Sequence, residues 1–91
     1  HNRRFEETRR EAEEALNRFC RHLGGIEEFL ASANHLAINA RVEAAKTTEH
    51  RRQFKAVADH IQESVIDIRE VVETVRKDVS DLQAIRARAA A

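Results

Sequence analysis

Hydrophobic residues recur along the chain at alternating steps of four and three residues. The first half carries this pattern from residue 12 to residue 44, and the second half carries it from residue 54 to residue 82. The residues at these positions are Ala12, Leu16, Phe19, Leu23, Ile26, Leu30, Ala33, Ala37, Ala40 and Ala44, then Phe54, Ala58, Ile61, Val65, Ile68, Val72, Val75, Val79 and Leu82. A sustained repeat of about 3.5 residues is typical of helices that wind around one another. The pattern therefore predicts two long amphipathic helices.

The two hydrophobic stripes predict a hairpin because they mirror each other about Glu49. Folding the chain at Glu49 brings each position of the first stripe from Leu16 onward level with one of the second, so that Leu30 lies opposite Ile68. The predicted boundaries are a helix over about 3–46, a turn over about 47–51 and a helix over about 52–88. At about 1.5 Å per residue, each helix is about 60 to 70 Å long.

More apolar residues flank the stripes than one antiparallel partner can cover. The flanking residues are Phe29, Leu36, Val42, Val57, Ile66 and Val71. Two hairpins that pack together as a four-helix bundle would cover them. We therefore expect an all-α fold, in which residues 1–91 form one long antiparallel helical hairpin, a coiled coil, that assembles as a dimeric four-helix bundle.

Composition supports helices and excludes several classes of partner. The chain contains no proline, and its two glycines are Gly24 and Gly25, so few residues oppose a helix. Charged residues make up 35% of the chain and the formal net charge is +0, with acids and bases interleaved. There is no basic field for nucleic acid. We expect a homodimer that binds no nucleic acid.

The chain has no apolar run of the roughly 20 residues that a membrane-spanning helix needs. We expect no membrane contact by this segment, and a cytoplasmic location. The first residue is His and methionine is absent, which suggests a piece of a longer protein. A membrane anchor or sensor could then lie outside it.

Residues with reactive side chains are few and poorly spaced for chemistry. The candidate metal ligands are Cys20, His22, His35, His50 and His60. Cys20 and His22 lie on different sides of a helix, and no two histidines are three or four residues apart. No nucleophile, base and acid set and no phosphate-binding glycine loop is present. We expect no enzyme activity, no cofactor and no metal, with a metal- or redox-responsive bundle as a minor alternative.

The segments NHLAINARVEAAK (34–46) and TTEHRRQFKAVAD (47–59) are the most specific part of the chain. They resemble, without a gap as far as Ile61, the hairpin tip of bacterial methyl-accepting chemotaxis proteins. The resemblance implies an antiparallel hairpin that dimerises into a four-helix bundle, with three dimers gathered at their tips. It also implies that the tip contacts a chemotaxis histidine kinase and its SH3-like adaptor protein.

The resemblance assigns roles to individual residues. The residues implied to bind partners at the tip are Asn39, Glu43, Glu49, Arg52, Phe54 and Val57. The residues implied to form the dimer and higher assemblies are Leu30, Asn34, His35, Leu36, Ile38, Ile61 and Val65.

The departures from the family pattern lie in the turn and in the assembly contacts. Thr48, Arg51 and Gln53 stand where the family usually has glycine, so the turn is made by residues that tolerate tight turns less well. The other departures are Ala31 for an aromatic residue, His35 for an aliphatic residue, Arg41 for an alanine and Lys46 for an arginine. They remove apolar packing and add a cost of desolvation, so we expect weakened contacts between dimers.

Two functions follow as expectations. The first is a signal-transducing, chemoreceptor-like module that presents its tip to a histidine kinase and an adaptor. The alternative is a divergent oligomerisation or regulatory coiled coil that has lost kinase coupling.

Overall fold

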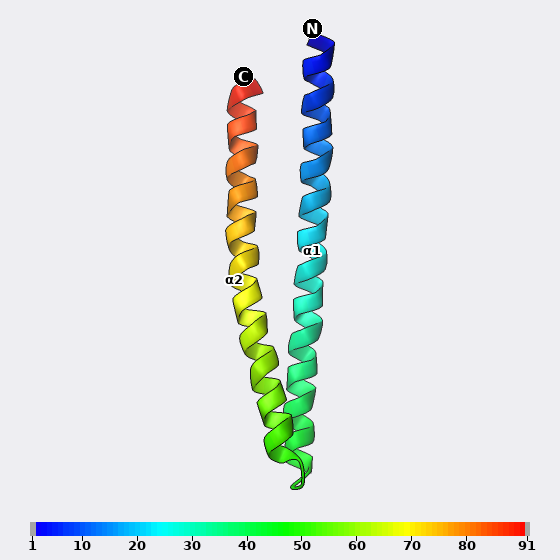
Figure 1. Cartoon of the computed structure of the whole chain (residues 1–91), viewed down its shortest axis with the longest axis vertical. Helices are drawn as coiled ribbons and strands as arrows, with labels where there is room; N and C mark the ends of the chain where they lie inside the picture. The colour runs from blue at the N-terminus through cyan, green and yellow to red at the C-terminus, as the bar shows by residue number, and fades with distance from the viewer. Residues whose placement is uncertain (1, 91) are drawn as a thin grey trace.

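The computed structural model describes residues 2–90 and shows two helices joined by a short turn. Helix α1 spans Asn2–Lys46 and helix α2 spans Arg51–Ala90. The helices lie side by side and antiparallel, with both termini at one end of a rod and the turn at the other (Figure 1). The rod measures 71 × 17 × 13 Å. The predicted all-α helical hairpin is confirmed, with the reversal at residues 47–50.

Helix α1 passes through Gly24 and Gly25 without interruption. A Cβ atom added at either glycine would meet no other atom within 4 Å. Close packing therefore does not require a glycine at these positions. Each glycine lowers the stability of the helix by about 1 kcal/mol relative to alanine, because the unfolded chain gains conformational freedom.

The core of the hairpin takes one residue in seven from each helix. The buried residues are Leu23, Leu30, Ala37 and Ala44 of α1 and Ala58, Val65, Val72 and Val79 of α2. Leu30, which is 1% exposed, clusters with Leu23, Val65 and Val72. Small alanines near the turn and larger residues above it match the way in which the helices separate away from the turn (Figure 1).

The pairing of layers differs from the prediction. Ile68, the expected partner of Leu30, is 41% exposed, whereas Val65 and Val72 share the buried cluster with Leu30. The buried positions of the two helices alternate along the rod, so Leu30 packs with Val65 and Val72 on either side of Ile68. The physical reason is that one partner helix covers only one of the two apolar positions in each heptad.

Ion pairs join the helices along one flank of the core. Glu27 pairs with Arg76, Glu13 pairs with Arg86, and Arg41 pairs with Asp59 at 2.6 Å. Several of these residues lie four positions after a buried one, as Glu27 follows Leu23, Arg41 follows Ala37, and Arg76 follows Val72. We call this side of the hairpin the salt-bridged face.

Apolar side chains collect on the opposite flank, at positions three residues after a buried one. Because a helix turns about 100° per residue, positions three and four after a buried residue lie on opposite sides of it. The ion pairs place the salt-bridged flanks of both helices on one side, so the apolar flanks share the other side. This apolar face comprises Phe19, Ile26, Ala33, Ala40, Phe54, Ile61, Ile68, Val75 and Leu82, with Phe29, Leu36, Val57 and Val71 at its edges.

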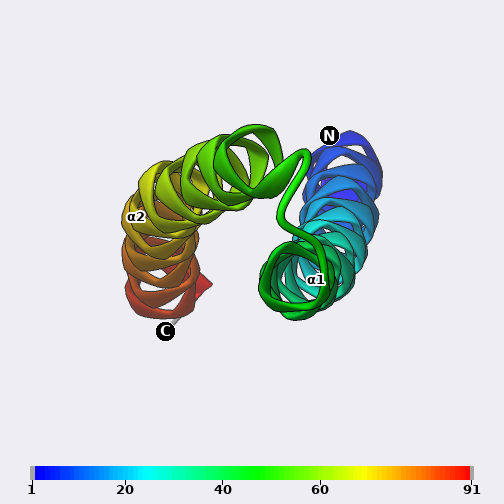
Figure 2. The same ribbon diagram turned by 90° about the horizontal axis from the view of Figure 1, so that it is seen from below.

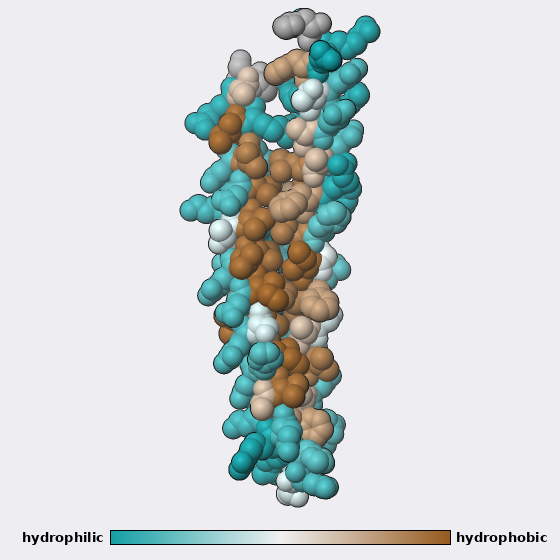
Figure 3. Space-filling model, viewed as in Figure 1, coloured by the Kyte–Doolittle hydropathy of each residue, from teal (hydrophilic) through white to brown (hydrophobic). Residues whose placement is uncertain are grey.

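The apolar face is open to solvent in the single chain. Phe29 is 68% exposed, Val71 61%, Leu36 59% and Ile26 40%. Figure 3 shows hydrophobic side chains in a continuous stripe that covers parts of both helices. Within residues 2–90, neither helix contains a stretch apolar enough to cross a bilayer.

Candidate functional site at the hairpin tip

The turn reverses the chain without any left-handed residue. Among residues 2–90 there is no cis peptide bond and no positive φ angle. Helix α2 starts directly after the turn, with the Phe54 amide donating to the His50 carbonyl at 3.0 Å. Figure 2, seen from the turn end, shows the loop crossing from one helix to the other. Thr48, Arg51 and Gln53 can therefore occupy positions where the family that the tip resembles has glycine, because this turn does not need glycine's conformational freedom.

Arg51 closes the C-terminal end of α1. Its Nε atom donates to the Ala44 carbonyl at 3.1 Å and to the Thr47 carbonyl at 3.3 Å. The last carbonyls of a helix have no partner within the helix, so this cation satisfies one of them, at Ala44, as well as the Thr47 carbonyl just beyond the helix, and it complements the helix dipole. The Glu49 amide donates to Oγ1 of Thr47 at 3.3 Å. Side chains therefore hold the turn in place of a glycine cap.

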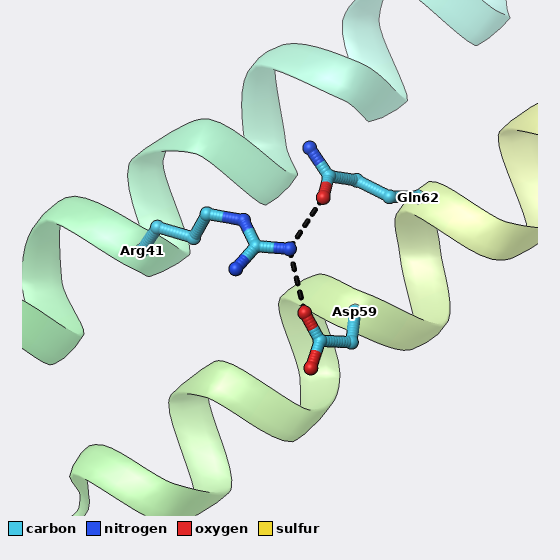
Figure 4. Close-up of polar contacts among 3 residues, drawn as sticks. All are labelled: Arg41, Asp59 and Gln62. Carbon is cyan, nitrogen blue, oxygen red and sulfur yellow. Dashed lines mark hydrogen bonds and ion pairs between the residues drawn. The ribbon is translucent and has the colours of Figure 1, made fainter.

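Arg41 joins the two helices just above the turn. One guanidinium nitrogen of Arg41 donates to Oδ1 of Asp59 at 2.6 Å and also to Oε1 of Gln62 (Figure 4). The Arg41 and Asp59 side chains are 39% and 52% exposed, so water screens the pair. The contact joins α1 to α2 on the salt-bridged face. It engages the Arg41 guanidinium with partners inside the hairpin.

The tip itself is polar and open. A shallow hollow at the tip is lined by Thr48, Glu49, Arg51, Arg52, Gln53 and Lys55. Lys46 lies 3.7 Å from Glu43, and His50 lies 4.0 Å from Glu49, whose side chain is 84% exposed. Figure 3 shows hydrophilic side chains gathered at this end of the rod. Their charges are available to a partner at a small cost of desolvation.

The residues implied to bind partners all lie near the tip but face different sides of it. Asn39, Glu43 and Arg52 are exposed. Phe54 is 39% exposed and Val57 is 53% exposed, and both lie on the apolar face. Glu49 lies in the turn. These residues surround the end of the rod and do not form a single patch.

The residues implied to form assemblies divide into three groups. Leu30 and Val65 are buried between the two helices of one chain, and Ile61 is packed against their cluster. Leu36 is 59% exposed on the apolar face. The others lie off that face: Asn34 is half-buried on the side of the salt-bridged face, whereas His35 is exposed and Ile38 is 44% exposed.

The side chains at the tip offer charge and hydrogen bonding, with no arrangement typical of a reactive centre. Within the described part of the chain, no three His, Cys, Asp or Glu residues are grouped so that they could hold a metal ion. Cys20 is free and half-buried.

Sequence reasoning missed the two arginines that shape the tip. In the sequence, Arg41 and Arg51 stand out only as departures from the pattern of the family that the tip resembles, although both form contacts that hold the structure together. A signal was present for Arg41, because Gln62 and Arg41 each lie four residues after a buried alanine. No comparable spacing points to Arg51, whose contact depends on the path of the turn.

Comparison of the chain with protein-family models, with curated proteins and with solved structures found no match.

Proposed function

We propose that this chain is a chemoreceptor-like signalling hairpin that dimerises through its apolar face and presents its tip to a histidine kinase and an SH3-like adaptor. The proposal places it in the cytoplasm as a protein-contact module. The sequence of the tip, from Asn34 to Ile61, suggests the class of partner. The observation that carries the proposal is the combination of an open polar tip with a continuous apolar face along the same rod.

The apolar face supports dimerisation on physical grounds. It alternates with the buried positions along both helices, so it continues the coiled-coil repeat outward rather than scattering over the surface. Phe29, Val71 and Leu36 are each more than half exposed, and contiguous apolar surface of this kind is normally covered by a partner. A second copy supplies an identical apolar face and completes a four-helix bundle.

The tip supports recognition of a partner with carboxylates near an apolar contact. Arg52 and Lys55 line the polar hollow, and Phe54 lies next to them in sequence with 39% of its surface exposed. Charged groups at an exposed rim speed association and set specificity, whereas a central aromatic residue supplies binding energy. The two kinds of group stand side by side at the end of the rod.

A second candidate is an oligomerisation or regulatory coiled coil without kinase coupling. Arg41, which replaces a small residue of the family pattern, is held by Asp59 and Gln62 and brings a bulky cation to the tip. The turn also differs from the family pattern, because the Arg51 side chain caps α1 where the family has glycine. In this alternative the apolar face has the same role and the tip has no kinase partner.

Titration of the purified chain with a chemotaxis adaptor and histidine kinase tests the choice. Glu43→Lys should weaken binding at least tenfold while far-UV circular dichroism stays helical. Glu28→Lys is the matched control, because Glu28 is also exposed on the same helix but lies away from the tip. No binding by the unaltered chain, together with dimerisation in solution, would favour the second candidate.

A further inference from the structure

Six residues that can carry charge line the two outer edges of the apolar face near the open end of the rod. They are Glu11, Arg18 and His22 on α1, and Asp78, Asp81 and Arg88 on α2. All six are exposed. Within residues 2–90, no ion pair of the hairpin uses any of them, whereas Glu13, Glu27, Arg76 and Arg86 are paired on the salt-bridged face.

Helical spacing places these residues one step outward from the apolar face. His22 follows Phe19 by three residues, and Asp78 follows Val75 by three. Arg18 and Asp81 lie one further turn along the same edges, and Glu11 and Arg88 lie seven residues beyond those two. The edges of α1 and α2 point away from each other, so they cannot meet within one hairpin.

A second hairpin brings unlike edges together. In a two-fold dimer whose axis runs along the rod, the outer edge of α1 in one copy meets the outer edge of α2 in the other. Rotation about that axis leaves the height of every residue unchanged. Residues that are level within one chain are then level across the interface.

The ion pair between Glu13 and Arg86 fixes which residues are level. Glu11 and Arg88 each lie two residues beyond this pair, toward the open end. Counting toward the tip, Arg18 lies five residues from Glu13, and Asp81 lies five from Arg86.

The same count places His22 level with Asp78, because His22 lies nine residues from Glu13 and Asp78 lies eight from Arg86. Every level pair combines an acid with a base.

We infer that a ladder of ion pairs, Glu11 with Arg88, Arg18 with Asp81 and His22 with Asp78, forms between two copies and sets them parallel with their tips together. The inference rests on the proposed dimer and adds its orientation and register. An antiparallel dimer would place the open end of one copy against the tip of the other, and the ladder would not form. Each pair occurs twice per dimer because of the symmetry.

Charge reversal tests the ladder by sedimentation equilibrium at low salt. Arg18→Glu should raise the dimer dissociation constant about tenfold, since it sets acids against Asp81 twice per dimer. Adding Asp81→Arg should restore it to within about threefold of the original value. Arg21→Glu, the same change on an exposed residue of α1 off the edge, is the control and should have little effect. Equal effects of Arg18→Glu and Arg21→Glu would overturn the ladder.

Orientation is tested by cross-linking in a Cys20→Ser background. Ala15 and Ile85 lie on the same two edges, level with each other, so Ala15→Cys with Ile85→Cys should give a covalent dimer on oxidation. Absence of that band in a chain that sediments as a dimer would overturn the parallel arrangement and leave dimerisation standing. A chain that stays monomeric in all conditions would instead overturn the proposed dimer, and the ladder with it.

Discussion

The two faces of the hairpin use the same helices for opposite purposes. The salt-bridged face carries its charges in pairs within the chain, as Glu27 with Arg76 and Arg41 with Asp59. The apolar face leaves large residues such as Phe29 and Val71 in solvent. One face has its charges paired within a single chain, whereas the other is left open to solvent and is covered only in the proposed dimer. A shift of one residue, from three to four positions after a buried residue, separates the two.

The core between the faces should be the most sensitive part of the molecule. Leu30→Ala should lower the free energy of unfolding by about 3 kcal/mol, because it opens a cavity beside Val65 and Val72 that neighbouring side chains fill only in part. Urea denaturation followed by circular dichroism at fixed protein concentration measures this change. Ile66→Ala, at a residue 57% exposed, is the control and should cost less than about 1 kcal/mol. Equal losses would show that Leu30 is not a core residue.

Substitutions on the apolar face should have the next largest effect. Phe29→Glu should raise the dimer dissociation constant about a hundredfold, because dimerisation would bury an unpaired carboxylate at two symmetric places. Val42, which the sequence placed beside the stripe, lies on an exposed side of α1 away from the apolar face, so Val42→Glu adds the same charge and should leave the dimer intact. Analytical ultracentrifugation compares the two variants. A dimer that tolerates Phe29→Glu would place the interface elsewhere.

A smaller effect in the stabilising direction is expected at Gly24. Gly24→Ala should raise the free energy of unfolding by about 1 kcal/mol, because the added Cβ meets no atom within 4 Å and the unfolded chain loses freedom. Chemical denaturation monitors the change. A decrease in stability would indicate that the helix bends or contacts a partner at this position.

The smallest effect should come from the salt-bridged face. Arg41→Ala should cost about 0.5 kcal/mol, since Arg41 and Asp59 are both well exposed to water. The difference from the unaltered chain should shrink in 1 M salt, where screening extends over about 3 Å. Thermal melts at two salt concentrations measure it. A loss above about 2 kcal/mol would mean that Arg41 fixes the position of the turn.

Much of the fold could be predicted from the sequence because helix period and symmetry are local properties. The two heptad stripes predicted two long helices and the position of the reversal, and α1 and α2 follow them. The sequence predicted less well which apolar residues of each layer are buried. Both apolar positions of each heptad looked equally buried, yet Leu30 is buried and Ile68 is 41% exposed. That choice depends on how many helices surround each position.

The site could be predicted only in outline. Sequence placed Glu49 in the turn and Arg52 next to it, because the reversal and the resemblance both locate that segment. The roles of Arg41 and Arg51 depend on long side chains that reach across helices, to Asp59 and to the Ala44 carbonyl. Contacts made by such long side chains leave no repeating pattern in the sequence. They become visible only when the path of the backbone is known.

The rod has one buried residue per helix in each layer, and this has a consequence for how it comes apart. Each layer contacts only the layers directly above and below it, so opening can begin at the free ends and proceed step by step, as a zip does. Amide hydrogens near Leu23 should exchange faster than those near Ala37, which lies closer to the covalent link between the helices. A covalent link between the two helices at the open end of the rod would therefore slow the separation of all the layers below it.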